Sequence, residues 1–517
     1  MKGTAGRIAK RLARRKRRIE NRLQVARDSR HVRAMSGAPP VFSTAGLKYE
    51  LADKTQAIVY GGVPLMLRVA RESGLVEAID RGLPILQSHC PYYESDHVLN
   101  FALNALCEGT CLQHIERRRN DEAFLNAIQA DSIPDPTTAG DFCRRFTPAN
   151  VRQLLDAINR ARLNVWQRQP DDFFDEAIID MDGTLTVTTG ECKEGMDISY
   201  KGDWGYHPLL VSLANTGEVL AIVNRSGNRP SEEGAADEAD RLIPLCREAG
   251  FRVLRFRGDT AFSQTKHLDR WHNTGHVLFQ FGYDATPNLK ELAEELPESA
   301  WQTLTRPAKY SVKTRPRAKP DNVKREVVRR RLFEHLELQS EQVAEFEYQP
   351  TACERAYRMV VIRKNISHEK GDHLLFDEIR YFFYITNDRE AMAAEIVFGC
   401  NDRCDQENLI AQLAGGLRAL SAPVDSLVSN WAYMVMTSLA WTLKAWSALL
   451  LPITPRHRES HEAARTTWLR MEFKTFVNEV LKVPCQIVRQ GRRVIPRVLH
   501  WNPQLPTFFR LAVALNC

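Results

Sequence analysis

Residues 177–190 constrain the fold of this chain more than any other stretch, because their side chains alternate between apolar and polar. The apolar positions are Ile179, Met181, Leu185 and Val187, and the polar positions are Asp180, Asp182, Thr184, Thr186 and Thr188. A period of two in a segment rich in Thr, Val and Ile predicts a β-strand with one buried face. Such a strand places Asp180 and Asp182 side by side on its other face.

These two neighbouring carboxylates are costly if buried. A buried charge destabilises a fold unless a cation partner or a divalent metal ion compensates it. The strand by itself therefore leaves two interpretations open. One is a compensated acidic site, and the other is an ordinary half-exposed strand whose acids are solvated.

Basic residues are concentrated at the N-terminus. The 517-residue chain has a net charge of +7, but residues 1–36 alone hold thirteen Lys or Arg against Glu20 and Asp28. One-signed charge of this density indicates a polyanionic partner, either nucleic acid or an anionic membrane. Residues 5–33 predict a basic helix, with a solvated tail as the alternative. The residues expected to contact DNA are Arg14, Arg15, Lys16, Arg17 and Arg18.

One uncharged segment, residues 426–443, is long enough to be considered as a membrane span. Its polar members are Asn430, Thr437, Ser438 and Thr442, and Lys444 follows at once. These residues favour a buried helix, and we expect no membrane partner. The absence of an apolar leader and the scattered cysteines indicate a cytoplasmic protein with reduced thiols.

The order of expected strands and helices from residue 171 onward predicts the fold class. Three strands come first, and they are followed by helix, strand, helix and strand. This order predicts an α/β fold with a ribonuclease-H-like mixed sheet, preceded by a mainly helical N-terminal region. Two strand-like runs, 358–363 and 381–386, predict a β-rich insertion with its own β-structure.

Composition and pattern divide the chain into six expected parts. They are a basic arm and linker at 1–62, a helical region for DNA ends and assembly at 63–170, a first catalytic part at 171–282, a β-rich basic insertion at 283–395, a second catalytic part at 396–450, and a C-terminal region at 451–517.

Three acidic residues are candidates for one site. Asp182 lies on the first strand, Asp259 just past a later strand, and Glu407 on a helix that it shares with Arg403 four residues earlier. In a ribonuclease-H-like sheet these three places converge, so the carboxylates would form an oxygen-only pocket. Such ligands suit Mg²⁺ or Mn²⁺, and two ions can support phosphodiester exchange. Taken singly, each acid is better explained as a solvated side chain.

The insertion carries a second basic stretch. Residues 306–331 hold eleven Lys or Arg against Asp321 and Glu326. We expect this stretch to contact DNA near the cleavage site, with a solvated surface as the alternative. The residues singled out are Arg329, Arg330 and Arg331.

Four motifs, in order, carry a resemblance to a known family. They are Ile-Asp-Met-Asp-Gly-Thr at 179–184, Gly-Tyr-His-Pro-Leu-Leu at 205–210, Arg-Gly-Asp-Thr-Ala-Phe at 257–262, and Arg403 with Glu407 and Asn408. Over residues 85–500 the chain resembles the DDE transposases of bacterial insertion sequences, in the group with a β-rich insertion before the final Glu. Relatives often have a Tyr and a Lys where this chain has Cys400 and Ala414.

The resemblance implies an activity and a set of roles. Asp182, Asp259 and Glu407 would be catalytic metal ligands, with Asp180 and Arg403 in support. Two Mg²⁺ or Mn²⁺ ions would serve metal-dependent cleavage of element ends and strand transfer into target DNA. The partners would be the terminal inverted repeats, target DNA and a second copy of the chain in a homodimer on DNA.

Two other classes remain as alternatives. Residues 180–185 also resemble the first motif of haloacid-dehalogenase-type phosphatases, in which Asp180 would be the nucleophile and Asp182 the general acid. That family needs the strand to end at the motif, whereas the alternation here continues through Thr188 and predicts one long strand. The third class is a DNA-binding protein that has lost catalysis.

Overall fold

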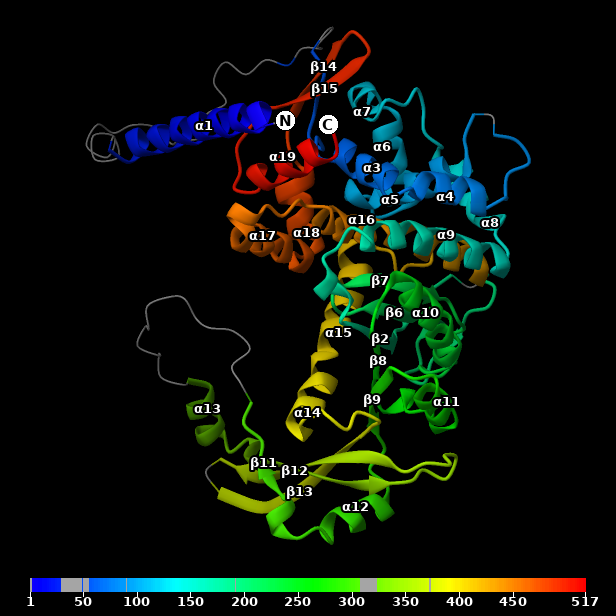
Figure 1. Ribbon diagram of the computed structural model, residues 1–517, viewed down its shortest axis with the longest axis vertical. Coiled ribbons are helices and arrows are strands. Elements are labelled where there is room, and N and C mark those ends of the chain that lie inside the picture. The colour runs from blue at the N-terminus through cyan, green and yellow to red at the C-terminus, as the bar shows by residue number, and fades with distance from the viewer. Residues whose placement is uncertain are drawn as a thin grey trace.

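A nine-stranded mixed sheet lies at the centre of the protein (Figure 1). The computed structural model describes residues 2–28, 49, 55–89, 91–190, 192–306, 323–371 and 373–517. The strand order is β10-β11-β12-β13-β9-β8-β2-β6-β7. β2 (Glu176–Gly183) pairs in parallel with β8 (Val253–Gly258) and antiparallel with β6 (Leu209–Leu213). This mixed sheet, with helices before and around it, confirms the predicted fold class.

The other strands of this sheet extend it on both sides. They are β7 (Glu218–Val223), β9 (Val277–Tyr283), β10 (Gln302–Thr303), β11 (Glu334–Tyr348), β12 (Tyr357–Lys370) and β13 (His373–Thr386). β6 and β7 form the hairpin expected around Asn215–Gly217. α10 (Ala235–Ala249) follows β7, and α11 (Leu268–Asn273) lies between β8 and β9.

The first strand is shorter than its alternating pattern predicted. β2 ends at Gly183, and Thr186–Val187 forms β3 in a separate three-stranded sheet with β5 (Trp204–Tyr206) and β4 (Asp197–Ile198). A Cβ on Gly205 would lie 2.2 Å from the Thr186 carbonyl oxygen, so the close pairing of β3 with β5 needs glycine there. The prediction of one strand through Thr188 was therefore wrong.

The region before the sheet is helical, as predicted. Its helices are α3 (Val63–Glu72), α4 (Leu75–Gly82), α5 (Glu94–Leu106), α6 (Glu116–Arg119), α7 (Glu122–Ile128), α8 (Pro136–Arg144) and α9 (Pro148–Trp166). The uncharged segment forms α16 (Leu427–Leu449), which is buried along nearly its whole length among α5, α9 and β7. Within the residues that the structure describes, neither α16 nor any other helix has the length and apolarity to cross a membrane.

A fully buried ion pair joins this helical region to the sheet. Glu218 of β7 accepts hydrogen bonds from Arg162 Nε of α9 at 3.1 Å and from the Trp166 indole at 2.9 Å. The indole of Trp446 in α16 donates to it at 2.7 Å, and the Thr216 hydroxyl also at 2.7 Å. Arg162 and Glu218 have no exposed side-chain surface. One carboxylate thus binds α9, β7 and α16 together.

The insertion continues the central sheet. It contains α12 (Pro287–Glu294), α13 (Val323–Arg331) and strands β10 to β13. The insertion contributes the β-structure expected of it, and β13 pairs with β9, with Phe383 opposite Tyr283, so its strands extend the central sheet. The two predicted runs are parts of the longer β12 and β13, and β11 was not predicted. Residues 307–322 of the basic stretch lie outside the described residues.

The chain then returns to the sheet and ends beside the N-terminal helix. α14 (Ala393–Asp402) and α15 (Cys404–Ala411) lead from the insertion towards α16. The C-terminal elements are α17 (Arg458–Arg470), α18 (Phe473–Phe476), β14 (Cys485–Gln490), β15 (Arg493–Val498) and α19 (Leu505–Ala514). β14 also pairs with β1 (Ala57–Ile58), and α1 (Lys2–Asp28) packs against α19 (Figure 1).

Glu218→Gln is expected to destabilise the fold by ~3 kcal/mol or more, because it leaves the buried Arg162 charge without a carboxylate to neutralise it. The measurement is urea unfolding followed by tryptophan fluorescence. Glu233→Gln is the matched control, because Glu233 makes a surface ion pair with Arg229 at 3.7 Å and should change stability by ~0.5 kcal/mol or less. Equal stabilities for the two variants would contradict the role assigned to Glu218.

Candidate active site

The site begins with a buried ion pair between the two parallel strands. Asp180 of β2 and Arg257 of β8 are opposite each other in the register. Arg257 Nε and Nη2 donate to the Asp180 carboxylate at 2.7 and 2.9 Å, and its Nη1 donates to the Gly399 carbonyl of α14 at 2.8 Å. The bidentate geometry engages both carboxylate oxygens. Because Asp180 is only 1% exposed, its carboxylate is sealed from solvent.

Asp182 lies two residues further along the same face of β2, in a different setting. Its side chain is 14% exposed, and Arg403 Nη1 approaches its Oδ2 at 3.2 Å. Burial raises the pKa of Asp182 to about 6; the Arg403 charge lowers it, and the Asp259 and Glu407 carboxylates raise it. The long strand predicted from the sequence would have placed Asp182 near its middle. In the structure, Asp182 lies near the C-terminal end of the shorter β2.

Asp259 and Glu407 come to the same edge of the sheet from two other elements. Asp259 directly follows β8, and its Oδ1 accepts from the Ala261 amide at 3.0 Å. Because β2 and β8 are parallel, their carboxyl ends meet at one edge, which brings Asp259 near Asp182. Glu407 is exposed on α15, one turn after Arg403. The carboxylates therefore differ in solvent exposure, because Asp182 is partly buried and Glu407 is exposed.

Two positioning residues were not singled out from the sequence. Gln406 is 1% exposed; its amide donates to the Leu210 carbonyl at 3.2 Å, and its oxygen accepts from the Ser212 hydroxyl. These bonds hold α15 against β6, next to β2. Arg257 was visible as part of the Arg-Gly-Asp-Thr motif, but its partner Asp180 is 77 residues away. Only the pairing of β2 with β8 reveals the contact.

The donor set fits divalent metal ions. Asp182, Asp259 and Glu407 offer only carboxylate oxygens, which suit Mg²⁺ or Mn²⁺. Burial first, and then the Asp259 and Glu407 charges, raise the pKa of Asp182, and a bound cation would favour its ionised form. Within the described part of the chain, these three do not form a group with all ligand atoms within 4.8 Å.

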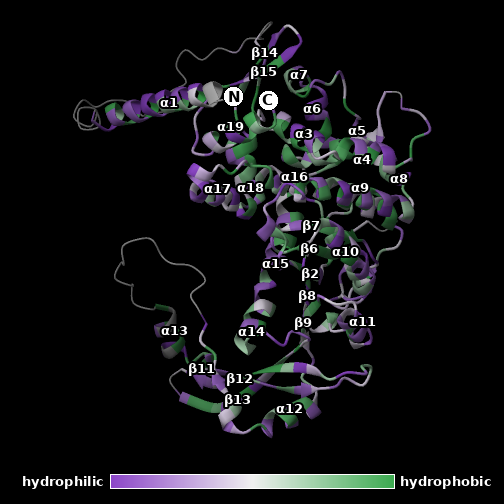
Figure 2. Ribbon diagram, viewed as in Figure 1, coloured by the Kyte–Doolittle hydropathy of each residue, from purple (hydrophilic) through white to green (hydrophobic). Residues whose placement is uncertain are grey.

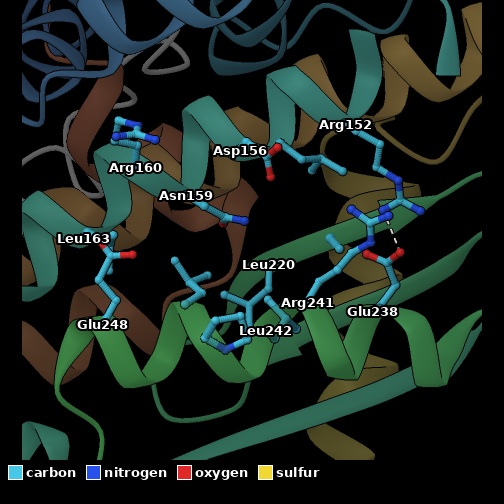
Figure 3. A pocket seen from close by; sticks show the side chains of 14 residues that line it. Arg152, Asp156, Asn159, Arg160, Leu163, Leu220, Glu238, Arg241, Leu242 and Glu248 are labelled. Atoms are coloured by element: carbon cyan, nitrogen blue, oxygen red, sulfur yellow. Dashed lines mark ion pairs between the residues drawn. The ribbon is translucent and has the colours of Figure 1, made fainter. Parts of the chain in front are cut away.

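A separate cavity of about 290 Å³ lies between α9 and α10 (Figure 3). Arg152 and Glu238 form an ion pair at 2.6 Å on its wall, and Asp156 and Arg241 also line it. None of the three candidate carboxylates borders this cavity. The Arg152–Glu238 pair bridges α9 and α10, so this cavity belongs to the joint between the helical region and the sheet.

The five basic residues expected on the N-terminal helix have different surroundings. Figure 2 shows α1 as largely hydrophilic, and Arg14, Arg17 and Arg18 are exposed on it. Arg15 instead donates to the Val498 and His500 carbonyls at 2.7 and 3.1 Å. Lys16 is exposed but lies 5.5 Å above the Trp501 ring. Arg14, Arg17 and Arg18 are thus exposed to solvent, whereas Arg15 and Lys16 contact the C-terminal segment.

The three basic residues singled out in the insertion lie on α13. Arg330 pairs with Glu326 at 2.7 Å on the surface, and Arg331 is exposed. Arg329 lies on the same helix. Figure 1 places α13 and α1 towards opposite ends of the molecule, with β2 and α15 between them. Two basic helices therefore lie on either side of the candidate carboxylates along the long axis.

Comparison with known proteins gives one family match. The family described as "Transposase DDE domain group 1" matches residues 55–515. Among solved structures, the chain is similar to a piggyBac transposase in a synaptic complex with hairpin DNA, determined by cryo-EM. The two share 10% identity and a TM-score of 0.36 over 83% of this chain and 84% of that one. No curated protein sequence matches the chain significantly.

The raised pKa of Asp182 predicts a pH-dependent stability that Asp182→Asn removes. The folded protein binds this proton more tightly than the unfolded chain, where the value is 3.8. The stabilisation is therefore fully present below about pH 4 and is lost as pH rises through about 6. The shift corresponds to ~3 kcal/mol.

The measurement is urea unfolding in a metal chelator at several pH values. The stability of the wild type minus that of the Asn variant should fall by up to ~3 kcal/mol between pH 4 and 7. Taking the difference between two chains cancels the titration of all other groups. A constant difference would show that Asp182 has an ordinary pKa.

Proposed function

The chain belongs to the transposase DDE domain group 1 family, and on that premise we propose that Asp182, Asp259 and Glu407 are the carboxylates with which it cleaves and joins DNA. The observation that carries this proposal is the convergence of three elements at one edge of the sheet, because the parallel strands β2 and β8 end there and α15 contacts β2. They come from the ends of β2 and β8 and from α15, far apart in sequence. Asp180 is excluded as a ligand because Arg257 engages both of its oxygens.

The residues around the carboxylates have distinct roles in this proposal. Asp182, Asp259 and Glu407 would hold Mg²⁺ or Mn²⁺. The chemistry that such ions supply when bound is activation of a water or 3′-hydroxyl and stabilisation of the departing oxygen. Arg403 fixes the Asp182 carboxylate and offsets its charge. Gln406 fixes α15, and therefore Glu407, against the sheet.

Each reaction exchanges one phosphorus–oxygen bond for another. In cleavage, a water oxygen bonds to the phosphorus and the 3′-oxygen leaves. In strand transfer, a 3′-hydroxyl of the element attacks a target phosphodiester and the target 3′-oxygen leaves. In both cases the protein orients an oxygen nucleophile in line with the leaving oxygen, and positioning contributes much of the rate.

The phosphatase alternative does not fit this site. Because β2 ends at Gly183, the length of this strand does not oppose the phosphatase. Two other observations oppose the alternative. The nucleophile that the phosphatase would require is Asp180, whose carboxylate is buried in an ion pair with Arg257. In addition, β2 pairs antiparallel with its neighbour β6. The family match over residues 55–515 supports the transposase instead.

We further propose that α1 and α13 bind DNA phosphates on either side of the site. The exposed Arg14, Arg17 and Arg18 support this for α1, and Arg330 and Arg331 support it for α13. Arg329 on α13 belongs to the same proposal. Charge of one sign on a helix surface gives sequence-independent affinity through phosphate contacts.

The natural substrate in this proposal is a bacterial insertion sequence. The protein would act in the cytoplasm on the terminal inverted repeats of its own element, as a homodimer that holds two DNA ends. The length and sheet continuity of the insertion before Glu407 support the group with a β-rich insertion. Inverted repeats in the DNA that flanks the coding region would test this directly.

Asp182→Asn, Asp259→Asn and Glu407→Gln are each expected to abolish cleavage of a labelled element end at every Mn²⁺ concentration, because each removes a ligand. Asp180→Asn is expected to retain partial activity that rises with Mn²⁺, since loss of a group that supports a ligand costs ~10–100-fold. Asp405→Asn, an exposed acid on α15, is the matched control and should cleave normally.

The pattern of the variants separates the alternatives. An active Asp182→Asn with an inactive Asp180→Asn would reverse the assignment and favour the phosphatase. A wild-type protein that binds element ends but never cuts them would favour a DNA-binding protein without catalysis. Loss of cleavage in Asp405→Asn would mean that any change on α15 is disruptive.

Neutralising Arg14, Arg17 and Arg18 to Gln should flatten the salt dependence of DNA binding. Each phosphate contact contributes about −0.9 to the slope of log affinity against log salt, so three losses should reduce its magnitude by ~2.7. Filter binding across a salt titration measures the slope. Arg15→Gln is the control, because Arg15 binds backbone carbonyls within the protein and should leave the slope unchanged.

The same assays distinguish the two basic helices. Reversing Arg329, Arg330 and Arg331 to Glu should reduce end cleavage while circular dichroism stays unchanged. Full cleavage by that variant would rule out α13 as a contact near the site. An unchanged slope after neutralising α1 would rule out the N-terminal helix.

A further inference from the structure

Three metal-ligating side chains converge on the insertion, away from the acidic site described above. They are His335 and Glu337 on β11 and Glu369 on β12. One ligand atom from each lies within 4.8 Å of the others. Of the part of the chain that the structure describes, this group alone brings three His, Cys, Asp or Glu ligands so close.

Strand geometry explains why these three meet. His335 is directly opposite Glu369 in the antiparallel pair of β11 and β12, so both side chains leave the same face. Glu337 is two residues further along β11 and therefore shares that face. His335 Nε2 lies 2.9 Å from Glu369 Oε2. The convergence is thus built into the register, which a one-residue slip would destroy.

A comparison with the nearby His368 shows what is unusual about the group. His368 Nε2 lies 2.8 Å from Glu378 Oε2, and Arg380 also donates to that carboxylate at 2.9 and 2.8 Å. The Glu378 charge is therefore compensated within the protein. Glu337 and Glu369, in contrast, have no Lys or Arg ion pair among the described residues. Two carboxylates close to one imidazole leave negative charge to be neutralised.

The imidazole is oriented for a metal. His335 Nδ1 lies 3.5 Å from the Phe333 carbonyl oxygen, and Nε2 lies 2.9 Å from Glu369 Oε2. In the tautomer that carries its proton on Nδ1, the Nε2 lone pair is free for coordination, which is the arrangement found behind metal-bound histidines. His335 is 31% and Glu369 21% exposed, so an ion can enter from solvent.

We propose that His335, Glu337 and Glu369 form a zinc site that clips the start of β11 to the end of β12. One imidazole with two carboxylates provides three ligands and an open fourth position, and mixed nitrogen and oxygen donors favour Zn²⁺ over Mg²⁺. The clip acts where α13 joins the sheet: the Phe333 amide donates to Val328 of α13, and its carbonyl accepts from Gly371. Bound zinc therefore fixes the connection between α13 and the sheet.

Zinc binding to the full-length protein tests the proposal. Accessible thiols are first alkylated, and excess Mg²⁺ is present throughout to saturate oxygen-only sites. Isothermal titration should then show one Zn²⁺ per chain. His335→Gln and Glu337→Gln should weaken this binding at least ~10-fold, as expected for loss of one of three ligands. His368→Gln is the matched control and should bind zinc like the wild type.

Substituting Co²⁺ for Zn²⁺ provides a second readout. The visible absorption of bound Co²⁺ should be present in the wild type and in His368→Gln and absent in His335→Gln. If His335→Gln does not fold by circular dichroism, the exposed Glu337→Gln decides the question. Equal zinc affinity in the wild type and in both ligand variants would overturn the proposal, as would no zinc binding by the wild type.

Discussion

The buried pair of Asp180 and Arg257 is the contact on which the candidate site depends. It joins β2 to β8, and through the Gly399 carbonyl it also joins both strands to α14. A buried ion pair offsets its desolvation only when geometry is good and the remaining polar atoms are bonded, and both conditions hold here. Asp182 and Asp259 lie two residues after Asp180 and Arg257, and Glu407 lies eight residues after Gly399. The position of the proposed carboxylates is thus set by a pair that takes no part in the chemistry.

The insertion between Asp259 and Glu407 is accommodated because it continues the sheet. β13 returns to β9 and pairs with it, so α14 starts beside the strand that precedes the insertion. The hydrogen bonds of Arg358 to the Asp388 and Ala391 carbonyls fix the segment just before α14. A long excursion of the chain therefore does not displace α15 from the edge of β2. The sheet acts as one rigid support for both the site and the insertion.

The two candidate metal sites differ in the chemistry of their donors. The carboxylates at the ends of β2 and β8 are oxygen-only, and they lie between two basic helices. The group on β11 and β12 adds an imidazole and lies at the connection to α13. Hard ions suit the first set, and zinc suits the second.

The sequence determined the local features of this protein. The alternation at 177–183 fixed a strand with Asp180 and Asp182 on one face, and the order of later elements fixed the fold class. The acids at 259 and 407 could be selected because motif order and a family resemblance supported them. The charge of residues 1–36 likewise predicted a basic helix. Each of these depends on periodicity or composition within a short window.

Only the tertiary structure decided which of these residues share a contact. Asp180 and Asp182 are equivalent in any strand pattern, and they differ because Arg257 faces one and Arg403 approaches the other. Arg14 and Arg15 are equivalent in a helix, and only docking against Val498 and His500 distinguishes them. The alternation through Thr188 wrongly predicted one strand, because Thr186 and Val187 pair with β5 in another sheet, where Gly205 permits the close approach. A local pattern encodes which face is buried, whereas the identity of the partner depends on pairing between segments distant in sequence.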